Sequence, residues 1–220
     1  MRSSPVADYA ANKPWKQAKR LHIMQNAYQL FAQHGIAPVT MPEIADASQV
    51  SRATLYRYFP SKAELVIAVN TWKWGEYIAA YDASLPQATL DQFTGAEYLR
   101  FYLDAFLDLY RYAPDILCFN YDFNSYLRHE TAAPERRESF LAMVDHLGTL
   151  FHAIYERGSR DGTINTSVPE ASMFSSSFHI MLAAATRYAV GLVYVSPGSD
   201  PEAELLMLEE LLFARFVRHP

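Results

Sequence analysis

The chain has 220 residues, of which 50% are hydrophobic and 20% charged, and its net charge is −5. This composition supports a sizeable core and excludes disorder of the whole chain. Glycine is scarce, with 8 residues, which favours helices over a turn-rich β fold. A single cysteine, Cys118, excludes an intrachain disulfide and a cysteine-rich metal site.

Charge is distributed unevenly along the chain. Residues 1–65 contain eight Lys and Arg and four Asp and Glu, so this part carries +4, whereas the remainder carries −9. Such a contrast is typical of a small module that meets a polyanion and is attached to a larger acidic body. A solvated surface alone is the simpler alternative.

The sequence contains no predicted membrane span or export signal. The longest apolar run, 180–195, is interrupted by Thr186 and Arg187 and falls short of the roughly 18 residues a span needs. The first twenty residues lack the apolar segment of a signal peptide. We therefore expect a soluble, cytoplasmic protein with no membrane partner.

The N-terminal part begins with a polar segment, residues 1–14, which contains two prolines and is expected to be a flexible arm. From Trp15 to His34, apolar residues recur at helical spacing. Gly35 then suits the left-handed conformation that ends many helices. We therefore expect the first helix to span 15–34.

Two short helices and a long one are predicted next. Thr40 and Glu43 fit a capping box, in which each side chain binds the other residue's backbone amide. Ser51 fits the N-cap of the second helix, and Ser61 fits the N-cap of the third. These helices are expected at 42–47, 52–59 and 62–84.

Short helix, tight turn and short helix form the pattern of a helix-turn-helix. Ile44, Ala45 and Leu55 supply apolar contacts that would hold the two helices at an angle. We therefore expect a three-helix head with a helix-turn-helix at residues 15–62. An ordinary three-helix bundle is the alternative.

The rest of the chain is also predicted to be helical. No segment shows a convincing strand alternation, and prolines and glycines separate the helical patterns. The fold class is therefore all-α, with an N-terminal head and a C-terminal helical body. The body helices after residue 84 are expected at 95–112, 115–129, 135–158, 169–195 and 201–218.

The second short helix has the chemistry of a DNA-reading helix. Such a helix presents its N-terminal residues to base edges and phosphates. Arg52 can pair with guanine, Thr54 can bond a phosphate, and Ala53 permits close approach. Lys62 would add a cation beside free helix amides. The predicted DNA-binding residues are Thr40, Ser51, Arg52, Ala53, Thr54, Tyr56, Arg57, Tyr58 and Lys62.

Some of these residues also fit other roles. Tyr58 fits the core of the head as well as its DNA face. Tyr56 and Arg57 fit a solvated surface, whereas Leu55 and Phe59 are expected in the core.

From Lys19 to Leu65 the sequence resembles the TetR family of transcriptional regulators. The matching residues are Ile23, Ala27, Leu30, Phe31, Gly35, Thr40, Ile44, Ala45, Val50, Ser51, Thr54, Leu55, Tyr56, Tyr58, Phe59, Lys62 and Leu65. One departure is Gln49, where the family usually has glycine. A left-handed backbone there would cost Gln about 1 kcal/mol more than Gly.

The resemblance implies about nine helices, a homodimer and a ligand-controlled repressor. It covers less than a quarter of the chain, and beyond Leu65 only the helix layout supports it. On this basis we assign residues 63–220 to an effector-binding and dimerisation domain.

The body is dense in aromatic residues between Trp72 and Tyr155, although any single ring is more often part of a core. Similar family members bind ligands between these helices, in mostly apolar pockets with a few polar groups. We therefore expect a small, largely apolar or aromatic effector. The predicted ligand-binding residues are Tyr102, Phe106, Tyr110, Phe123, Tyr126, His152, Tyr155 and His179.

The last two helices resemble the dimerisation pair of the family. The final one is apolar on more than one side, and small residues at 181–191 would let helices approach closely. The predicted dimer-interface residues are Met181, Ala185, Tyr188, Leu205, Leu208, Leu212 and Phe216.

Catalytic patterns are weak. His129-Glu130 starts like a zinc protease motif, but Ala133 occupies the position of the second histidine. The seven histidines lack metal-ligand spacing, and no glycine-rich phosphate loop occurs. We expect no enzyme activity, no cofactor and no metal.

The sequence therefore predicts a repressor that a small-molecule effector releases from a pseudo-palindromic, double-stranded DNA operator. One alternative is an activating or ligand-insensitive regulator of the same fold. Another is a helical small-molecule-binding or interaction protein that does not bind DNA.

Overall fold

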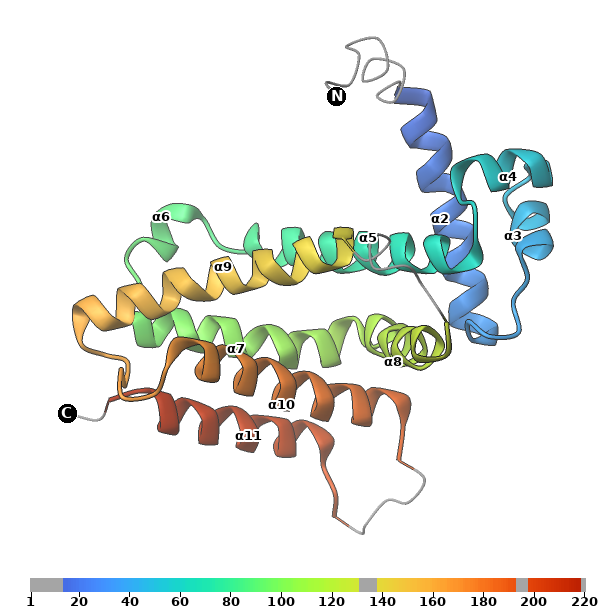
Figure 1. The fold of residues 1–220 in the computed structure, drawn as a ribbon. Helices are drawn as coiled ribbons and strands as arrows, with labels where there is room; N and C mark the ends of the chain where they lie inside the picture. Colours follow the sequence, from blue (N-terminus) through green and yellow to red (C-terminus); the bar gives the residue numbers. More distant parts are fainter. Residues whose placement is uncertain (1–13, 131–137, 193–197, 219–220) are drawn as a thin grey trace. The chain divides into compact units, whose positions relative to one another are not determined.

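The computed structural model describes residues 14–130, 138–192 and 198–218. These residues form ten helices and no strand, apart from one isolated bridge between Ile164 and Val217. Figure 1 shows the helices in chain order. They are α2 (Pro14–His34), α3 (Met41–Ala47), α4 (Arg52–Tyr58), α5 (Lys62–Asp82), α6 (Gln87–Leu90), α7 (Gly95–Tyr112), α8 (Pro114–His129), α9 (Glu138–Asp161), α10 (Glu170–Val190) and α11 (Pro201–Phe216).

The all-α fold class is confirmed, and nine of these helices match predicted ones to within three residues at most ends. The exception is the end of α10, which stops at Val190 before Gly191, whose φ is 99°. The predicted continuation to Val195 lies outside the described residues, as does the predicted arm up to residue 13. Helix α6 was not predicted, because a single turn after Pro86 leaves too short a pattern.

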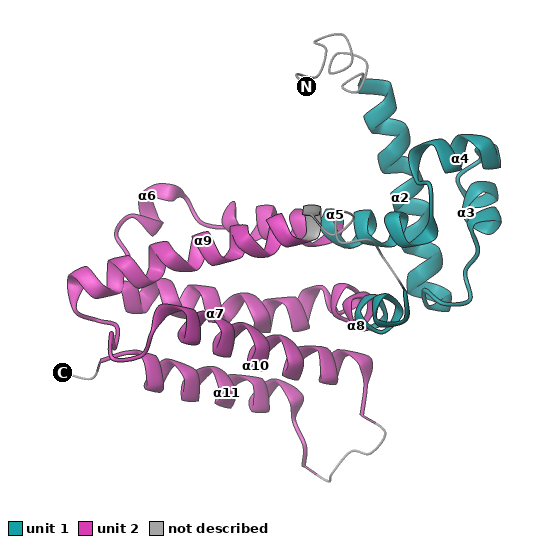
Figure 2. Ribbon diagram, in the orientation of Figure 1, with its two compact units in different colours: residues 1–72, 122–139 teal, residues 73–121, 140–220 magenta. Residues whose placement is uncertain are grey.

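The chain divides into two compact units, shown in Figure 2. The first unit comprises residues 1–72 and 122–139, and the second comprises 73–121 and 140–220. The predicted head, 15–62, lies in the first unit. That unit also takes in the first half of α5 and the end of α8.

The first unit is built around a capped helix-turn-helix. The capping box is present, with the Thr40 amide donating to Glu43 Oε2 at 2.7 Å and the Glu43 amide donating to Thr40 Oγ1 at 3.4 Å. Ser51 caps α4 by accepting from the Thr54 amide at 3.1 Å. These bonds satisfy amides that a helix start leaves without intrahelical partners. The core beneath them includes Ile23, Ala27, Phe31, Ile44, Leu55 and Phe59.

The turn between α3 and α4 contains a strained residue. Gln49 has φ 52°, and it is the only non-glycine residue with positive φ among those described. The left-handed conformation expected of this turn is therefore present, and Gln occupies it without glycine's freedom.

The second unit packs its long helices lengthwise. Helices α10 and α11 run side by side and both pack on α7, as Figure 1 shows. One core cluster lies among α7, α9, α10 and α11 and includes Leu99, Leu103, Phe151, Met173 and Phe216. Two other members of this cluster, Phe106 and Ile154, also line the cavity described below.

Two glycines allow α7 and α9 to touch. A Cβ added at Gly95 would lie 2.1 Å from Gly158 Cα, and one added at Gly158 would lie 2.3 Å from Ile164 Cγ1. A hydrogen bond also holds the start of α7 at this crossing: the Gly95 amide donates to Asp161 Oδ2 at 2.7 Å.

Candidate functional site

Helix α4 turns a polar face outward. Arg52, Ala53, Tyr56 and Arg57 are exposed, whereas Leu55 is buried and anchors the helix. Tyr56 is 47% exposed, so its ring and hydroxyl are open to solvent. The outward face therefore combines two guanidinium groups, a phenol and a small residue.

The charged and hydroxyl groups of this face are available to a ligand. Within the described part of the chain, no hydrogen bond or ion pair engages Arg52 or Tyr56, and Arg57 only lies over the ring of Tyr58 at 5.7 Å. Thr54 and Tyr58 are half-buried. Thr40 and Ser51 already serve as helix caps, so their predicted DNA contacts would share the same oxygens.

Lys62 is held by its own unit. Its ammonium donates to the carbonyl oxygen of Ala37 at 2.9 Å and lies 5.1 Å from the centroid of the Tyr126 ring. Burial lowers the pKa of Lys62, and the carboxylates of Glu130 and Glu43 oppose that effect. The predicted phosphate contact of Lys62 therefore competes with an existing structural contact.

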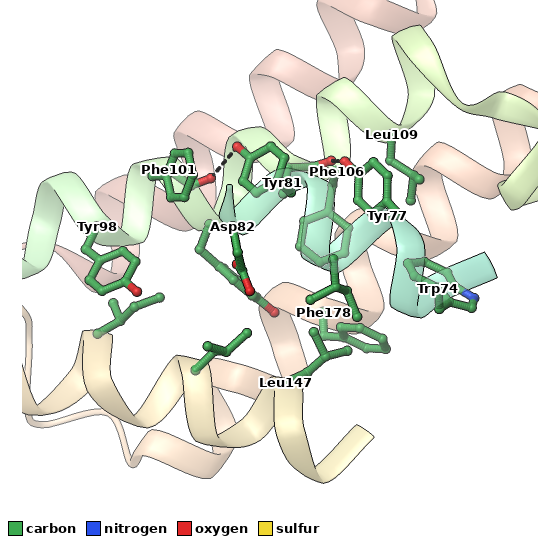
Figure 3. A pocket seen from close by; sticks show the side chains of 15 residues that line it. Trp74, Tyr77, Tyr81, Asp82, Tyr98, Phe101, Phe106, Leu109, Leu147 and Phe178 are labelled. Atoms are coloured by element: carbon green, nitrogen blue, oxygen red, sulfur yellow. Dashed lines mark hydrogen bonds between the residues drawn. The ribbon is translucent and has the colours of Figure 1, made fainter. Parts of the chain in front are cut away.

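The second unit contains a partly open cavity of about 80 Å³ beside an aromatic wall (Figure 3). Helix α5 contributes Trp74, Tyr77, Tyr81 and Asp82, and α7 contributes residues from Tyr98 to Leu109. Helix α9 contributes three aliphatic residues, and α10 contributes Phe178. This volume is well below the ~300 Å³ typical of the smaller drug-sized pockets, so the cavity fits a compact group as it stands.

The polar atoms of the cavity wall differ in how they are bonded. Tyr77 and Tyr81 donate their hydroxyls to the carbonyl oxygens of Ala105 and Phe101, so these hydroxyls are already satisfied. Tyr102 is different, because its buried hydroxyl has no hydrogen-bond partner among the described residues. Burial raises the pKa of Tyr102, so this phenol stays neutral.

Asp82 is the only charged residue among those described in the cavity wall. Figure 3 shows its side chain projecting into the space between α5 and α9, with Tyr98 on one side and Phe178 on the other. Burial raises the pKa of Asp82, and His146 opposes that effect. The cavity is thus apolar and aromatic, with one carboxylate.

The structure brings together only part of the predicted ligand-binding set. Tyr102 and Phe106 line the cavity. Tyr110 packs edge-on against Tyr188, and the Tyr155 hydroxyl donates to the Val168 carbonyl oxygen. Phe123 is buried in the first unit, Tyr126 lies under Lys62, and neither His152 nor His179 lines the cavity.

The two predicted histidines lie on the protein surface. Both side chains are exposed, and His152 Nδ1 lies 3.0 Å from Glu170 Oε1. The Glu170 carboxylate raises the pKa of His152, with a smaller contribution from Glu156.

The contribution of α5 to the cavity was not predicted. Trp74, Tyr77 and Tyr81 recur at a spacing that puts them on one face, and this spacing is the signal that could have identified them. Because aromatic residues are denser in α7 and α8, the prediction included residues of α8. The residues of α8 do not line the cavity.

Most of the predicted dimer residues face inward. Met181, Ala185, Leu205, Leu212 and Phe216 are buried within the subunit, and Tyr188 and Leu208 are half-buried. The large apolar residues of α10 and α11 that stay exposed are Ile180, Val190, Leu206, Met207 and Leu211.

Two further features bear on the class of protein. Among the described residues, no helix is long and apolar enough to cross a membrane. The same residues contain no group of three or more His, Cys, Asp or Glu side chains that could hold a metal ion.

The fold and the head define a helix-turn-helix protein with a helical body. Residues 23–69 match the sequence pattern of the family described as bacterial regulatory proteins, tetR family. The HTH-type transcriptional regulator AcrR of Shigella flexneri is 33% identical over 73 residues, which are 32% of this chain and 34% of that protein. The chain thus spans only about a quarter to a third of the length of the curated relatives it matches first.

Solved structures extend the likeness of the fold to the body. The regulator FadR of Bacillus subtilis, in complex with stearoyl-CoA, is 17% identical, with a TM-score of 0.67 over 88% of this chain and 97% of that one. A protein of Saccharomonospora viridis in complex with choline is 16% identical, with a TM-score of 0.69 over 92% and 100%. The likeness to the tetR family of bacterial regulatory proteins thus lies in the sequence of residues 23–69, and beyond them it is a likeness of fold.

Proposed function

We propose that this protein is a DNA-binding transcriptional regulator, a repressor that a small effector releases from a pseudo-palindromic operator. The observation that carries the DNA-binding step is the outward face of α4. Arg52, Ala53 and Tyr56 are exposed on a short helix whose start is capped and whose inner side is buried. Side chains at the start of such a helix can reach base edges in the major groove.

The charge distribution supports the same partner. Residues 1–65 carry +4 in a protein whose net charge is −5. A basic module on an acidic body favours a polyanion at the module and disfavours it elsewhere.

The cavity supports control by a small molecule. It is lined by four helices of one unit, and its wall is largely aromatic. Two structural relatives are solved with small molecules, stearoyl-CoA and choline. Helix α5 carries both the first residues after the helix-turn-helix and five of the lining residues, so it is our candidate for the element that transmits ligand binding. Control also requires that the effector bind the DNA-released state more tightly than the DNA-bound state.

Binding to DNA that flanks the protein's own gene tests the DNA-binding proposal. Arg52→Ala should relax preference at one base position, at a cost of about 1–3 kcal/mol, because an Arg pairs with guanine through two hydrogen bonds. Arg128→Ala is the matched control, since Arg128 is an exposed arginine on α8, outside the helix-turn-helix. Equal loss on every sequence for Arg52→Ala would show that Arg52 only positions the head.

The same assay, repeated with a panel of small molecules, separates the alternatives. Release of DNA by a compound supports the ligand-controlled repressor. DNA binding that no compound changes favours a ligand-insensitive regulator. Compound binding without any DNA binding favours a small-molecule-binding protein that does not act on DNA.

A further inference from the structure

We propose that the cavity binds a compact organic cation, an ammonium group held against aromatic rings with its charge opposite Asp82. This inference rests on the proposed role of the cavity as the effector site, and it adds the chemical class of the effector. Three properties of the described cavity wall carry it.

The first property is the sign of the charge. Asp82 is the only charged residue among those described in the wall, which contains no Lys, Arg or His. An anionic ligand would enter an apolar space without a counter-charge and beside a carboxylate, and both features cost free energy. A cation instead finds a fixed negative partner.

The second property is the state of that carboxylate. Within the described residues, no hydrogen bond or ion pair holds Asp82. Asp82 is exposed as a residue, so its carboxylate lies where the cavity opens to solvent, and a ligand cation can reach it from there. Partial burial still raises its pKa, so a cation beside it would favour the ionised form. The group that opposes this effect is His146 on α9, which does not line the cavity.

The third property is the aromatic wall. Tyr81 and Phe101 are stacked with their centroids 4.6 Å apart, and Trp74, Tyr98 and Phe178 also line the cavity. The faces of such rings attract cations, by about 2 kcal/mol when the site is desolvated. Because the volume is about 80 Å³, a compact ammonium group fits better than a long chain.

A pair of isosteric probes isolates the charge. Phenyltrimethylammonium and tert-butylbenzene have the same shape, and only the first is charged. Calorimetry at pH 8, above the range in which histidines titrate, would measure the affinity of each for the full-length protein. Benzoate provides the opposite charge on a similar ring.

Asp82→Asn tests the residue, and Asp145→Asn is the matched control, because Asp145 is exposed on α9 and does not line the cavity. We expect the ratio of cation to neutral-probe affinity to fall about fivefold to tenfold in Asp82→Asn, as expected for loss of one partly solvated charge pair. The ratio should not change in Asp145→Asn, and benzoate should bind most weakly in the wild type.

An unchanged ratio in Asp82→Asn would overturn the inference, and so would binding of neither isosteric probe to the wild type. Binding of tert-butylbenzene without phenyltrimethylammonium would also overturn it, while leaving an apolar effector and the proposed function intact. Conversely, cation binding by a protein that binds no DNA would support the inference and contradict the proposed function. Thermal unfolding of each variant confirms that it folds.

Discussion

Gln49 is the residue at which sequence and backbone conformation disagree most clearly. Its φ of 52° places it in the left-handed region, where a side chain with a Cβ is disfavoured. The residue is exposed, so its side chain gains no burial that would offset this cost. The turn that joins α3 to α4 is therefore less stable than the same turn with glycine.

Gln49→Gly should raise the free energy of unfolding by up to about 1 kcal/mol, because glycine adopts positive φ without the Cβ penalty. Part of the gain is offset by the greater freedom of glycine in the unfolded chain. Denaturant unfolding measures the change, with Gln49→Ala as the control that keeps the Cβ. If both variants have the same stability, the backbone at position 49 carries no strain.

At the scale of single residues, local chemistry was predictable and long-range partners were not. The caps at Thr40 and Ser51 depend on neighbours three positions away, so the sequence contains the whole interaction. The contact of Lys62 with Ala37 spans 25 positions, and no local pattern indicates it. The sequence could therefore identify a cation at Lys62 but not the carbonyl oxygen that holds it.

At the scale of helices, α7 and α9 approach each other very closely at one point, where Gly95 meets Gly158. Gly95 touches Gly158 so closely that a Cβ on Gly95 would overlap backbone atoms, which cannot rotate away as a side chain can. The amides at the start of α7 also donate to Asp161 and Thr163, which fixes the spacing between the helices.

Gly95→Ala should destabilise the protein by about 1–3 kcal/mol or more, as overpacking does where neighbours cannot move. Gly75→Ala is the matched control, because Gly75 is exposed on α5 and a Cβ there meets nothing within 4 Å. It should stabilise α5 by about 1 kcal/mol, the difference in helix propensity. Thermal unfolding measures both changes, and equal effects at the two positions would contradict the close crossing.

Helix boundaries were predictable because prolines, glycines and caps mark them. Pro201 follows the N-cap Asp200 at the start of α11, and Gly35 follows the end of α2 with φ 76°. Which helices pack against one another was harder to predict from the sequence. The cavity is lined by α5, α7, α9 and α10, and no spacing within one helix shows which others face it.

At the scale of the whole molecule, the homodimer stays a prediction. Several of the residues predicted for its interface are buried within the subunit, so we now expect other residues there. Helices α10 and α11 are apolar on more than one side, so the sequence could not show which side the subunit uses for its own core. Leu205, Leu212 and Phe216 are buried there. The outer side of α11 retains Met207, 56% exposed, and Leu211, 60% exposed.

This outer side is the surface we expect a second copy to cover. Met207 and Leu211 are four positions apart and share a helix face, and Ile180 and Val190 remain exposed on α10, which packs beside α11. A two-fold dimer uses the same surface of both copies, so one substitution places two changes in the interface. A charge at the centre of such an apolar surface would be buried without a partner.

Leu211→Asp should therefore convert the dimer to a monomer at micromolar concentration, as measured by size-exclusion chromatography with light scattering. Leu141→Asp is the matched control, because Leu141 is also an exposed leucine, 52% exposed, but lies on α9. A two-headed protein binds two half-sites together, so Leu211→Asp should also weaken binding to a palindromic operator far more than binding to a single half-site. A wild-type protein that is monomeric, or a Leu211→Asp variant that stays dimeric, would show that this side of α11 is not the interface.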